Sequence, residues 1–171
     1  MATKNFKIRT IAQLGKLGKR YNFVNSLLKK LVHIYAIITN GRYTRGSLCI
    51  ITNTSNEILL VESSYQKGKG FVGGLPNSRN EQPTETVIRE IFEEINLTLE
   101  TNPKFIGQYV QKNTRHIDAV FSYSLNADEL GSIKINDGEL KKIDWYDIEE
   151  ASQLLNHDGK EILKIYEQSI S

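Results

Sequence analysis

The sequence predicts an α/β domain in which helices pack against a mixed β-sheet, preceded by a basic amphipathic helical extension. The order of the segments supports this prediction, because a pair of strands, a glycine-rich loop, a helix, further strands and closing helices follow one another. The 171 residues and 39% hydrophobic content suffice for one domain with its own core. We therefore expect an extension over residues 1–43 and a domain over residues 44–171.

The extension is distinguished by its charge. The first 56 residues hold ten Lys or Arg and no acid, whereas the remaining 115 hold twelve basic and twenty acidic residues. Apolar side chains recur at helical spacing over residues 10–38, with Lys29 and Lys30 on the other side. Residues 1–45 therefore suit contact with nucleic acid or an anionic membrane, or packing on the acidic domain or a second copy in a homodimer. An organellar transit peptide is a further alternative, and the sequence leaves all of these open.

Composition also excludes several classes of protein. No uninterrupted apolar run approaches the ~18 residues that span a bilayer, so we expect no transmembrane segment. Cys49 is the only cysteine, which rules out an intrachain disulfide and a multi-cysteine zinc site. Its neighbours Leu48 and Ile50 are apolar, which predicts a buried thiol on a strand. We expect a globular protein located in the cytoplasm.

The elements of the domain can be assigned in order. Residues 46–52 and 57–63 read as strands, and the polar turn between them predicts a hairpin. Residues 64–80 contain four glycines and predict a loop with one short extended piece around Phe71 and Val72. Beyond the helix that follows, we predict strands at residues 104–112, 116–125, 132–135 and 143–146, and helices at residues 147–155 and 159–168.

The helix after this loop ends near residue 95 and carries two stripes of side chains. Pro83 suits its first position, and Asn96 suits a left-handed cap at its end. Successive residues turn by about 100°, which places four apolar side chains on one face: Ile88, Ile91, Phe92 and Ile95. The same geometry makes three carboxylates converge on another face: Glu90, Glu93 and Glu94. One face predicts a core contact, and the other predicts a partner of positive charge.

The acidic stripe is unfavourable without such a partner. Like charges at these separations repel by roughly 0.2–0.5 kcal/mol per pair, and the last helical turn disfavours anions further. Arg89 offsets part of this repulsion, but one guanidinium cannot neutralise three carboxylates. A divalent cation can, and a set of oxygen ligands suits Mg²⁺ or Mn²⁺ better than Zn²⁺. A solvated acidic helix face is the alternative for this pattern taken alone.

The wider motif resembles the signature of the Nudix hydrolase family, GX5EX7REUXEEXGU, in which U is a bulky apolar residue. Glu81, seven residues, and then Arg89-Glu90-Ile91-Phe92-Glu93-Glu94-Ile95-Asn96-Leu97 reproduce its second part. Two positions depart from it: the opening glycine falls on Leu75, directly after Gly73 and Gly74, and Asn96 replaces the last glycine. The resemblance covers about residues 44–160 and implies an α/β/α sandwich with a mixed sheet.

The resemblance also implies roles for individual residues. Glu90, Glu93 and Glu94 would bind Mg²⁺ or Mn²⁺, Glu90 would be a candidate general base, and Arg89 would orient the carboxylates. Glu81 would contribute through a contact behind these ligands or through a water, and Glu139 is a candidate further metal ligand or an exposed turn acid. Candidates for holding phosphates are Lys67, Lys69 and Arg79, and candidates for stacking are Tyr65, Phe71, Tyr109 and Tyr123. We interpret Trp145 as a packing residue and assign no role to His33, His116 and His157.

The predicted function is therefore metal-dependent hydrolysis of the diphosphate linkage in a nucleoside diphosphate joined to another moiety. A diphosphate carries crowded negative charge, which metal ions neutralise while they lower the pKa of the attacking water. The alternative is a catalytically attenuated Nudix-fold binding or regulatory module that uses its basic N-terminal arm. The altered glycine loop favours this alternative, and the retained carboxylates favour the enzyme.

Overall fold

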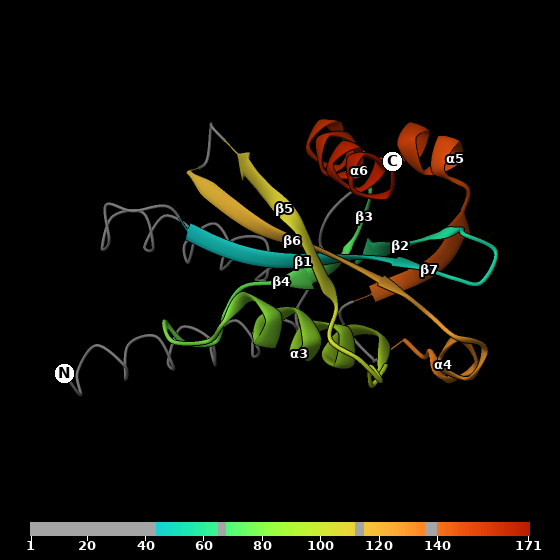
Figure 1. The fold of residues 1–171 in the computed structure, drawn as a ribbon, viewed down its shortest axis with the longest axis horizontal. Helices are drawn as coiled ribbons and strands as arrows, with labels where there is room; N and C mark the ends of the chain where they lie inside the picture. The colour runs from blue at the N-terminus through green and yellow to red at the C-terminus, as the bar shows by residue number, and fades with distance from the viewer. Residues whose placement is uncertain (1–43, 65–67, 112–114, 136–139) are drawn as a thin grey trace.

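The computed structural model describes residues 44–64, 68–111, 115–135 and 140–171. The expected helical extension over residues 1–43 lies outside the described residues. The described part of the chain forms three layers, in which helix α3 (Pro83–Ile95) covers one face of a β-sheet and helices α5 (Ile148–Leu154) and α6 (His157–Ile170) cover the other (Figure 1). None of the described helices is long and apolar enough to cross a membrane.

The sheet is mixed, as predicted. Its strands in the described chain are β1 (Thr44–Thr52), β2 (Ile58–Ser63), β3 (Lys69–Gly70), β4 (Val72–Gly74), β5 (Lys104–Gln111), β6 (His116–Ser124) and β7 (Leu140–Tyr146). The main path runs β3-β2-β1-β6-β5, while β4 pairs with β1 and β7 pairs with β2. Strands β1 and β6 are parallel and the other pairs are antiparallel. A mixed sheet between two helical layers confirms the predicted fold class.

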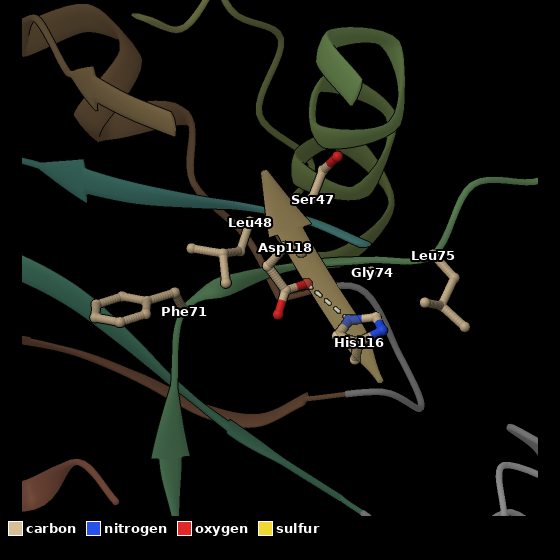
Figure 2. A pocket seen from close by; sticks show the side chains of 8 residues that line it. Ser47, Leu48, Phe71, Gly74, Leu75, His116 and Asp118 are labelled. Atoms are coloured by element: carbon tan, nitrogen blue, oxygen red, sulfur yellow. Dashed lines mark hydrogen bonds and ion pairs between the residues drawn. The ribbon is translucent and has the colours of Figure 1, made fainter. Parts of the chain in front are cut away.

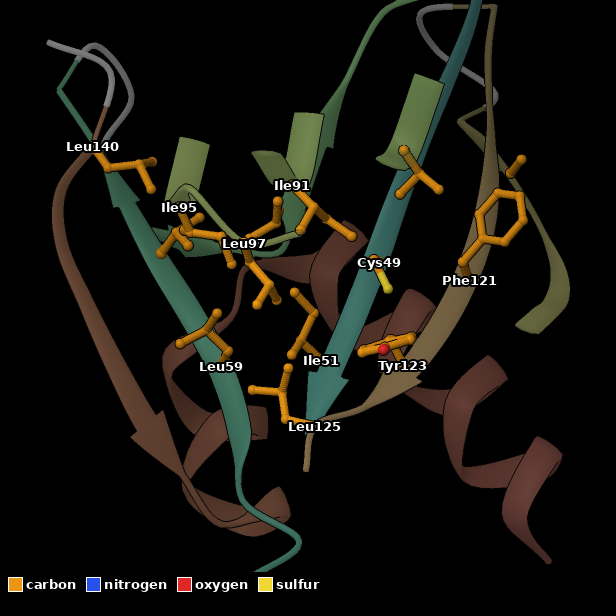
Figure 3. Packing of buried hydrophobic residues seen from close by; sticks show 14 residues of the cluster. Cys49, Ile51, Leu59, Ile91, Ile95, Leu97, Phe121, Tyr123, Leu125 and Leu140 are labelled. Atoms are coloured by element: carbon orange, nitrogen blue, oxygen red, sulfur yellow. The ribbon is translucent and has the colours of Figure 1, made fainter. Parts of the chain in front are cut away.

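Alternation along the strands divides the apolar residues between two cores. From β1, Cys49 and Ile51 face α3, whereas Leu48 and Ile50 face α5 and α6. Burial raises the pKa of the Cys49 thiol, as expected for a packing residue rather than a nucleophile. The α3-side core, shown in Figure 3, also includes Leu59, Ile91, Ile95, Leu97, Phe121, Tyr123, Leu125 and Leu140.

The strand register brings distant parts of the sequence together at one end of β1. The parallel pairing of β1 with β6 places Thr44 beside His116 and Gly46 beside Asp118. On the other side of β1, the antiparallel pairing with β4 places Ser47 beside Gly74. The glycine-rich loop therefore reaches the sheet at the same level as the start of β6, and β4 also contacts α3.

One predicted strand is wrong. We expected a strand at residues 132–135, but Ala127–Ser132 forms helix α4 and residues 133–135 belong to no strand. The helix begins with a reciprocal cap, in which the Glu129 N–H donates to Asn126 Oδ1 at 2.8 Å and the Asn126 N–H donates to Glu129 Oε2 at 3.1 Å. This capping box stabilises a helix start at Ala127, and the helix takes up Ser132 before the isoleucines at positions 133 and 135.

Candidate active site

Helix α3 begins and ends where the sequence predicts. Pro83 is its first residue, and Glu85 Oε2 accepts a hydrogen bond from the Gln82 N–H at 2.9 Å. At the other end Asn96 adopts φ 54°, in the left-handed region, and its N–H donates to the Phe92 carbonyl at 3.0 Å. These local caps fix where the helix begins and ends.

The inner face of α3 differs from the predicted one. Val87, Ile91 and Ile95 pack into the α3-side core, but Glu90 and Glu94 are buried beside them, with 7% and 4% of their areas exposed. Phe92 leaves 51% of its area exposed. We predicted Phe92 on the buried face with the apolar stripe. The buried face of α3 instead includes part of that stripe together with Glu90 and Glu94. The helix thus presses these two acids against the sheet.

Arg89 connects the acids of the motif. Its Nη1 lies 2.7 Å from Glu90 Oε1 and 3.1 Å from Glu93 Oε2, and its Nε lies 2.8 Å from Glu81 Oε1. Burial alone would lower the pKa of the guanidinium, but the hydrogen bonds and charges of Glu81 and Glu90 outweigh it and raise the pKa. Arg89 therefore remains charged and fixes the direction in which these carboxylates point.

The same guanidinium ties the preceding loop to the helix. Arg89 Nη2 donates to the Leu75 carbonyl at 2.9 Å, and the Asn77 N–H donates to Glu81 Oε2. Glu81 consequently uses one oxygen for the loop and the other for Arg89. The predicted contact of Glu81 behind the acidic face is therefore a contact to Arg89.

Two glycines bring the backbone of β4 against the buried acids. A Cβ on Gly74 would lie 2.5 Å from both Cδ and Oε1 of Glu90, so only glycine fits there without displacing the carboxylate. The Gly73 N–H donates to Glu94 Oε2 at 3.3 Å. Leu75, on which the opening glycine of the motif falls, has its side chain 46% exposed. The close approach is made by Gly74 instead.

A pocket of about 170 Å³ lies along the same glycine strand. Its apolar part is formed by Leu48 from β1 and Phe71 from the loop before β4, and its polar part by His116 and Asp118 from β6 (Figure 2). Ser47, Gly73, Gly74 and Leu75 complete the lining. Gly74 thus contacts both the pocket and the carboxylate of Glu90.

His116 and Asp118 form a hydrogen-bonded pair in this pocket. Nε2 of His116 lies 2.9 Å from Asp118 Oδ1, and its Nδ1 lies 2.7 Å from the Thr44 hydroxyl. His116 had no predicted role, and no sequence pattern indicated Asp118. Alternate residues of a strand point to the same face, so the spacing within residues 116–118 was the available signal. It was uninformative without knowing which strands lie beside β6.

The remaining predicted residues have other partners. Lys69 Nζ lies 3.1 Å from Asp144 Oδ2 and 4.9 Å from the centre of the Tyr146 ring, so it is not a free phosphate ligand. The hydroxyl of Tyr109 donates to Asp158 at 2.6 Å, and that of Tyr123 donates to Glu129 at 2.5 Å. Trp145 packs on the α3-side core, and Arg79 is exposed on the loop. The candidates outside the described residues are Tyr65, Lys67 and Glu139, and His33, which has no predicted role, also lies outside them.

The donor chemistry of the acidic face fits a divalent cation. Within the described ranges, no three acidic, histidine or cysteine side chains already converge as a preformed metal cage. Arg89 engages Glu90 and Glu93, and the buried acids Glu90 and Glu94 contribute only hard carboxylate oxygens. Carboxylates held out of water need cationic or hydrogen-bonding partners, and such ligands suit Mg²⁺ or Mn²⁺.

Comparison with known proteins supports a family assignment. Residues 42–166 match the family model described as the NUDIX domain. A search among curated protein sequences found no match.

Solved structures share the fold at low identity. The MutT protein from Methanosarcina mazei Go1 has a TM-score of 0.63 and 22% identity, covering 76% of this chain and 96% of its own. The NUDIX domain of Shewanella oneidensis NrtR, complexed with ADP ribose, has a TM-score of 0.63 and 12% identity, covering 75% and 89%. An Ap4A hydrolase from C. elegans has a TM-score of 0.58 and 16% identity, covering 73% and 97%.

Proposed function

The chain belongs to the Nudix hydrolase family and is a pyrophosphohydrolase of that type, and from this premise we propose that it hydrolyses a nucleoside diphosphate joined to another moiety, with Mg²⁺ or Mn²⁺. The observation that carries the proposal is the position of Gly74. Its backbone lies against the Glu90 carboxylate, and the same residue lines the pocket. The pocket lies on the α6 side of the sheet and Glu90 on the α3 side, so a substrate seated in the pocket would pass its diphosphate around Gly74, at the end of β4, to reach the acidic face.

The reaction is a displacement at phosphorus. A water oxygen forms a new bond to one phosphorus atom, and the bond from that phosphorus to the bridging oxygen breaks. The bridging oxygen leaves on the second phosphate, and the proton lost by the water passes to a base. Glu90 is our candidate for that base, because it is a buried carboxylate held by Arg89 and packed against Gly74, which lines the pocket.

Three carboxylates would hold the metal: Glu90, Glu93 and Glu94. When bound, a divalent cation neutralises diphosphate charge and lowers the pKa of the attacking water. Arg89 would orient Glu90 and Glu93, while the Gly73 N–H orients Glu94. Glu81 would act through Arg89, and Glu139 stays a prediction.

A nucleotide-type substrate is supported by what related folds bind. One protein with this fold was solved with ADP ribose, and another is an Ap4A hydrolase. The pocket of about 170 Å³ is smaller than the roughly 300–1,000 Å³ typical of sites for drug-sized ligands, so it suits one moiety of such a substrate.

A substrate panel tests the proposal. Purified protein is incubated with nucleoside diphosphate derivatives, either in the presence of Mg²⁺ or Mn²⁺ or in the presence of a chelator. The products are separated and identified by mass spectrometry. We expect hydrolysis of at least one derivative that stops on chelation and in Glu94→Gln. Glu167→Gln, on an exposed position of α6, is the matched control and should behave as wild type. Hydrolysis that survives both chelation and Glu94→Gln would overturn the mechanism.

The second candidate is an attenuated Nudix-fold binding or regulatory module. It is favoured by the engagement of Glu90 and Glu93 by Arg89. Binding of nucleotides without any turnover across the panel would select it. Contact of residues 1–45 with nucleic acid or anionic membranes, a homodimer and a cytoplasmic location stay predictions.

A further inference from the structure

The pocket beside Gly74 has an apolar side and a polar side. Leu48 and the ring of Phe71 form the apolar side, and both are partly buried and pack against the core between the sheet and α6. Asp118 lies between Phe71 and His116 in Figure 2. A flat ring seated on Phe71 would therefore present its edge to the Asp118 carboxylate.

The hydrogen bonds of the pair determine what Asp118 offers. A carboxylate only accepts hydrogen bonds, so His116 Nε2 is the donor in the 2.9 Å contact with Asp118 Oδ1. The Thr44 hydroxyl at 2.7 Å holds the other ring nitrogen and fixes the orientation of the imidazole. Within the described residues, no hydrogen bond to Asp118 Oδ2 is observed. Asp118 can thus still accept a hydrogen bond from a ligand.

Gly46 makes space for this pair. A Cβ at this position would lie 2.3 Å from Asp118 Oδ1 and 2.9 Å from His116 Nε2. A side chain on β1 at this level would therefore displace the contact between His116 and Asp118. Strand β1 thus leaves room for this pair at Gly46, just as β4 leaves room for Glu90 at Gly74.

We propose that Asp118, positioned by His116, is a specificity-determining residue that accepts a hydrogen bond from the exocyclic amino group of a nucleobase seated on Phe71. Bases with such a group, such as adenine or cytosine, would be preferred over their oxo counterparts, hypoxanthine and uracil. An oxo group places its lone pairs against the carboxylate, so repulsion disfavours an oxo base in addition to the missing hydrogen bond. The inference rests on the proposed function, since the base is read as one part of that substrate.

Binding of mononucleotides tests the inference without catalysis. Dissociation constants for AMP, IMP, CMP and UMP are measured by NMR titration of the full chain without added metal. A hydrogen bond to a charged group corresponds to roughly a tenfold to hundredfold preference, so we expect AMP to bind that much more tightly than IMP, or CMP than UMP. Asp118→Asn should bring the ratio near unity. Asp128→Asn, at an exposed position in α4, should leave it unchanged.

Two further variants separate positioning from folding. His116→Leu removes the N–H donor and should lower the preference ratio, whereas His116→Gln keeps a donor and should restore part of it. Gly46→Ala should lower the ratio, and Gly70→Ala, whose new Cβ meets no atom within 4 Å, should not. Loss of folding would lower the affinity for all four mononucleotides together and would leave no ratio to restore.

The outcomes distinguish this inference from the proposed function. The inference would be overturned by equal affinities for AMP and IMP together with equal affinities for CMP and UMP. It would also be overturned if none of the four mononucleotides binds, or if the preference persists in Asp118→Asn. These outcomes count against it even if the substrate panel shows hydrolysis. A preference that disappears in Asp118→Asn supports it, even if no derivative is hydrolysed. In that case the pocket distinguishes between bases, but the proposed hydrolysis is not supported.

Discussion

Replacing Gly74 with alanine should disable the site while leaving most of the fold intact. The added Cβ would lie 2.5 Å from Glu90 Cδ, whereas ordinary contacts begin at 3.4 Å, so the carboxylate must move by about 0.9 Å. Glu90 cannot move freely, because Arg89 Nη1 holds Oε1 at 2.7 Å. The backbone of Gly74 lies outside the left-handed region, so the alanine itself is not strained.

The size of the effect follows from this displacement. A misplacement of about 1 Å can cost roughly 100-fold in rate, so we expect kcat/KM to fall by about that factor. Overpacking should lower the free energy of unfolding by about 1–3 kcal/mol. Urea denaturation, together with steady-state hydrolysis of a derivative selected from the panel, measures both quantities.

Gly70→Ala is the matched control, because its Cβ meets no atom within 4 Å. It should keep wild-type activity and stability. If Gly74→Ala is folded and its kcat/KM stays within about threefold of wild type, the contact between β4 and Glu90 does not position the catalytic acid, and the reasoning fails.

Three further predictions concern charge and backbone. Arg89→Lys keeps the charge, but a lysine cannot contact Glu81, Glu90 and Glu93 together. We expect kcat/KM to fall and the free energy of unfolding to drop by about 1–3 kcal/mol. Unchanged values of both quantities would contradict the role of the guanidinium. Lys142 first, and then Lys69 and Tyr146, lower the pKa of Asp144 to about 2, against an opposing contribution from burial. This stabilisation is present above the ordinary pKa of 3.8 and is lost as the pH falls toward 2. Asp144→Asn should thus lower the free energy of unfolding by about 1 kcal/mol at pH 7 and by less at pH 3, as measured by urea denaturation. The same decrease at both pH values would exclude this linkage. Asn96→Ala should destabilise by about 1 kcal/mol because φ is positive there, while Asn96→Gly should unfold close to wild type, and equal thermal midpoints of the two variants would contradict this.

Local signals in the sequence were enough to predict α3. Pro83 and Asn96 mark its ends, and the repeat of apolar residues fixes its period. The face that is buried was harder to predict, because the sequence alone does not show that β4 lacks side chains where Glu90 and Glu94 approach it. Two carboxylates could therefore take an inner position that apolar residues usually hold.

The pocket could not be predicted, because its residues come from strands far apart in the sequence. Leu48, Phe71 and Asp118 meet only through the pairing of β1 with both β4 and β6. No single segment carries a pattern for that arrangement. Helix α4 is a different case, since its capping box within residues 126–129 is a local signal that the sequence itself carries.

Metal binding by the acidic face of α3 is tested most directly by titrating Mn²⁺ without substrate and following the free ion by electron paramagnetic resonance. Wild type should bind Mn²⁺, and Glu90→Gln, Glu93→Gln and Glu94→Gln should each weaken binding by about tenfold or more, whereas Glu167→Gln should not. No binding by wild type, or an affinity unchanged in all three variants of the acidic face, would contradict the account.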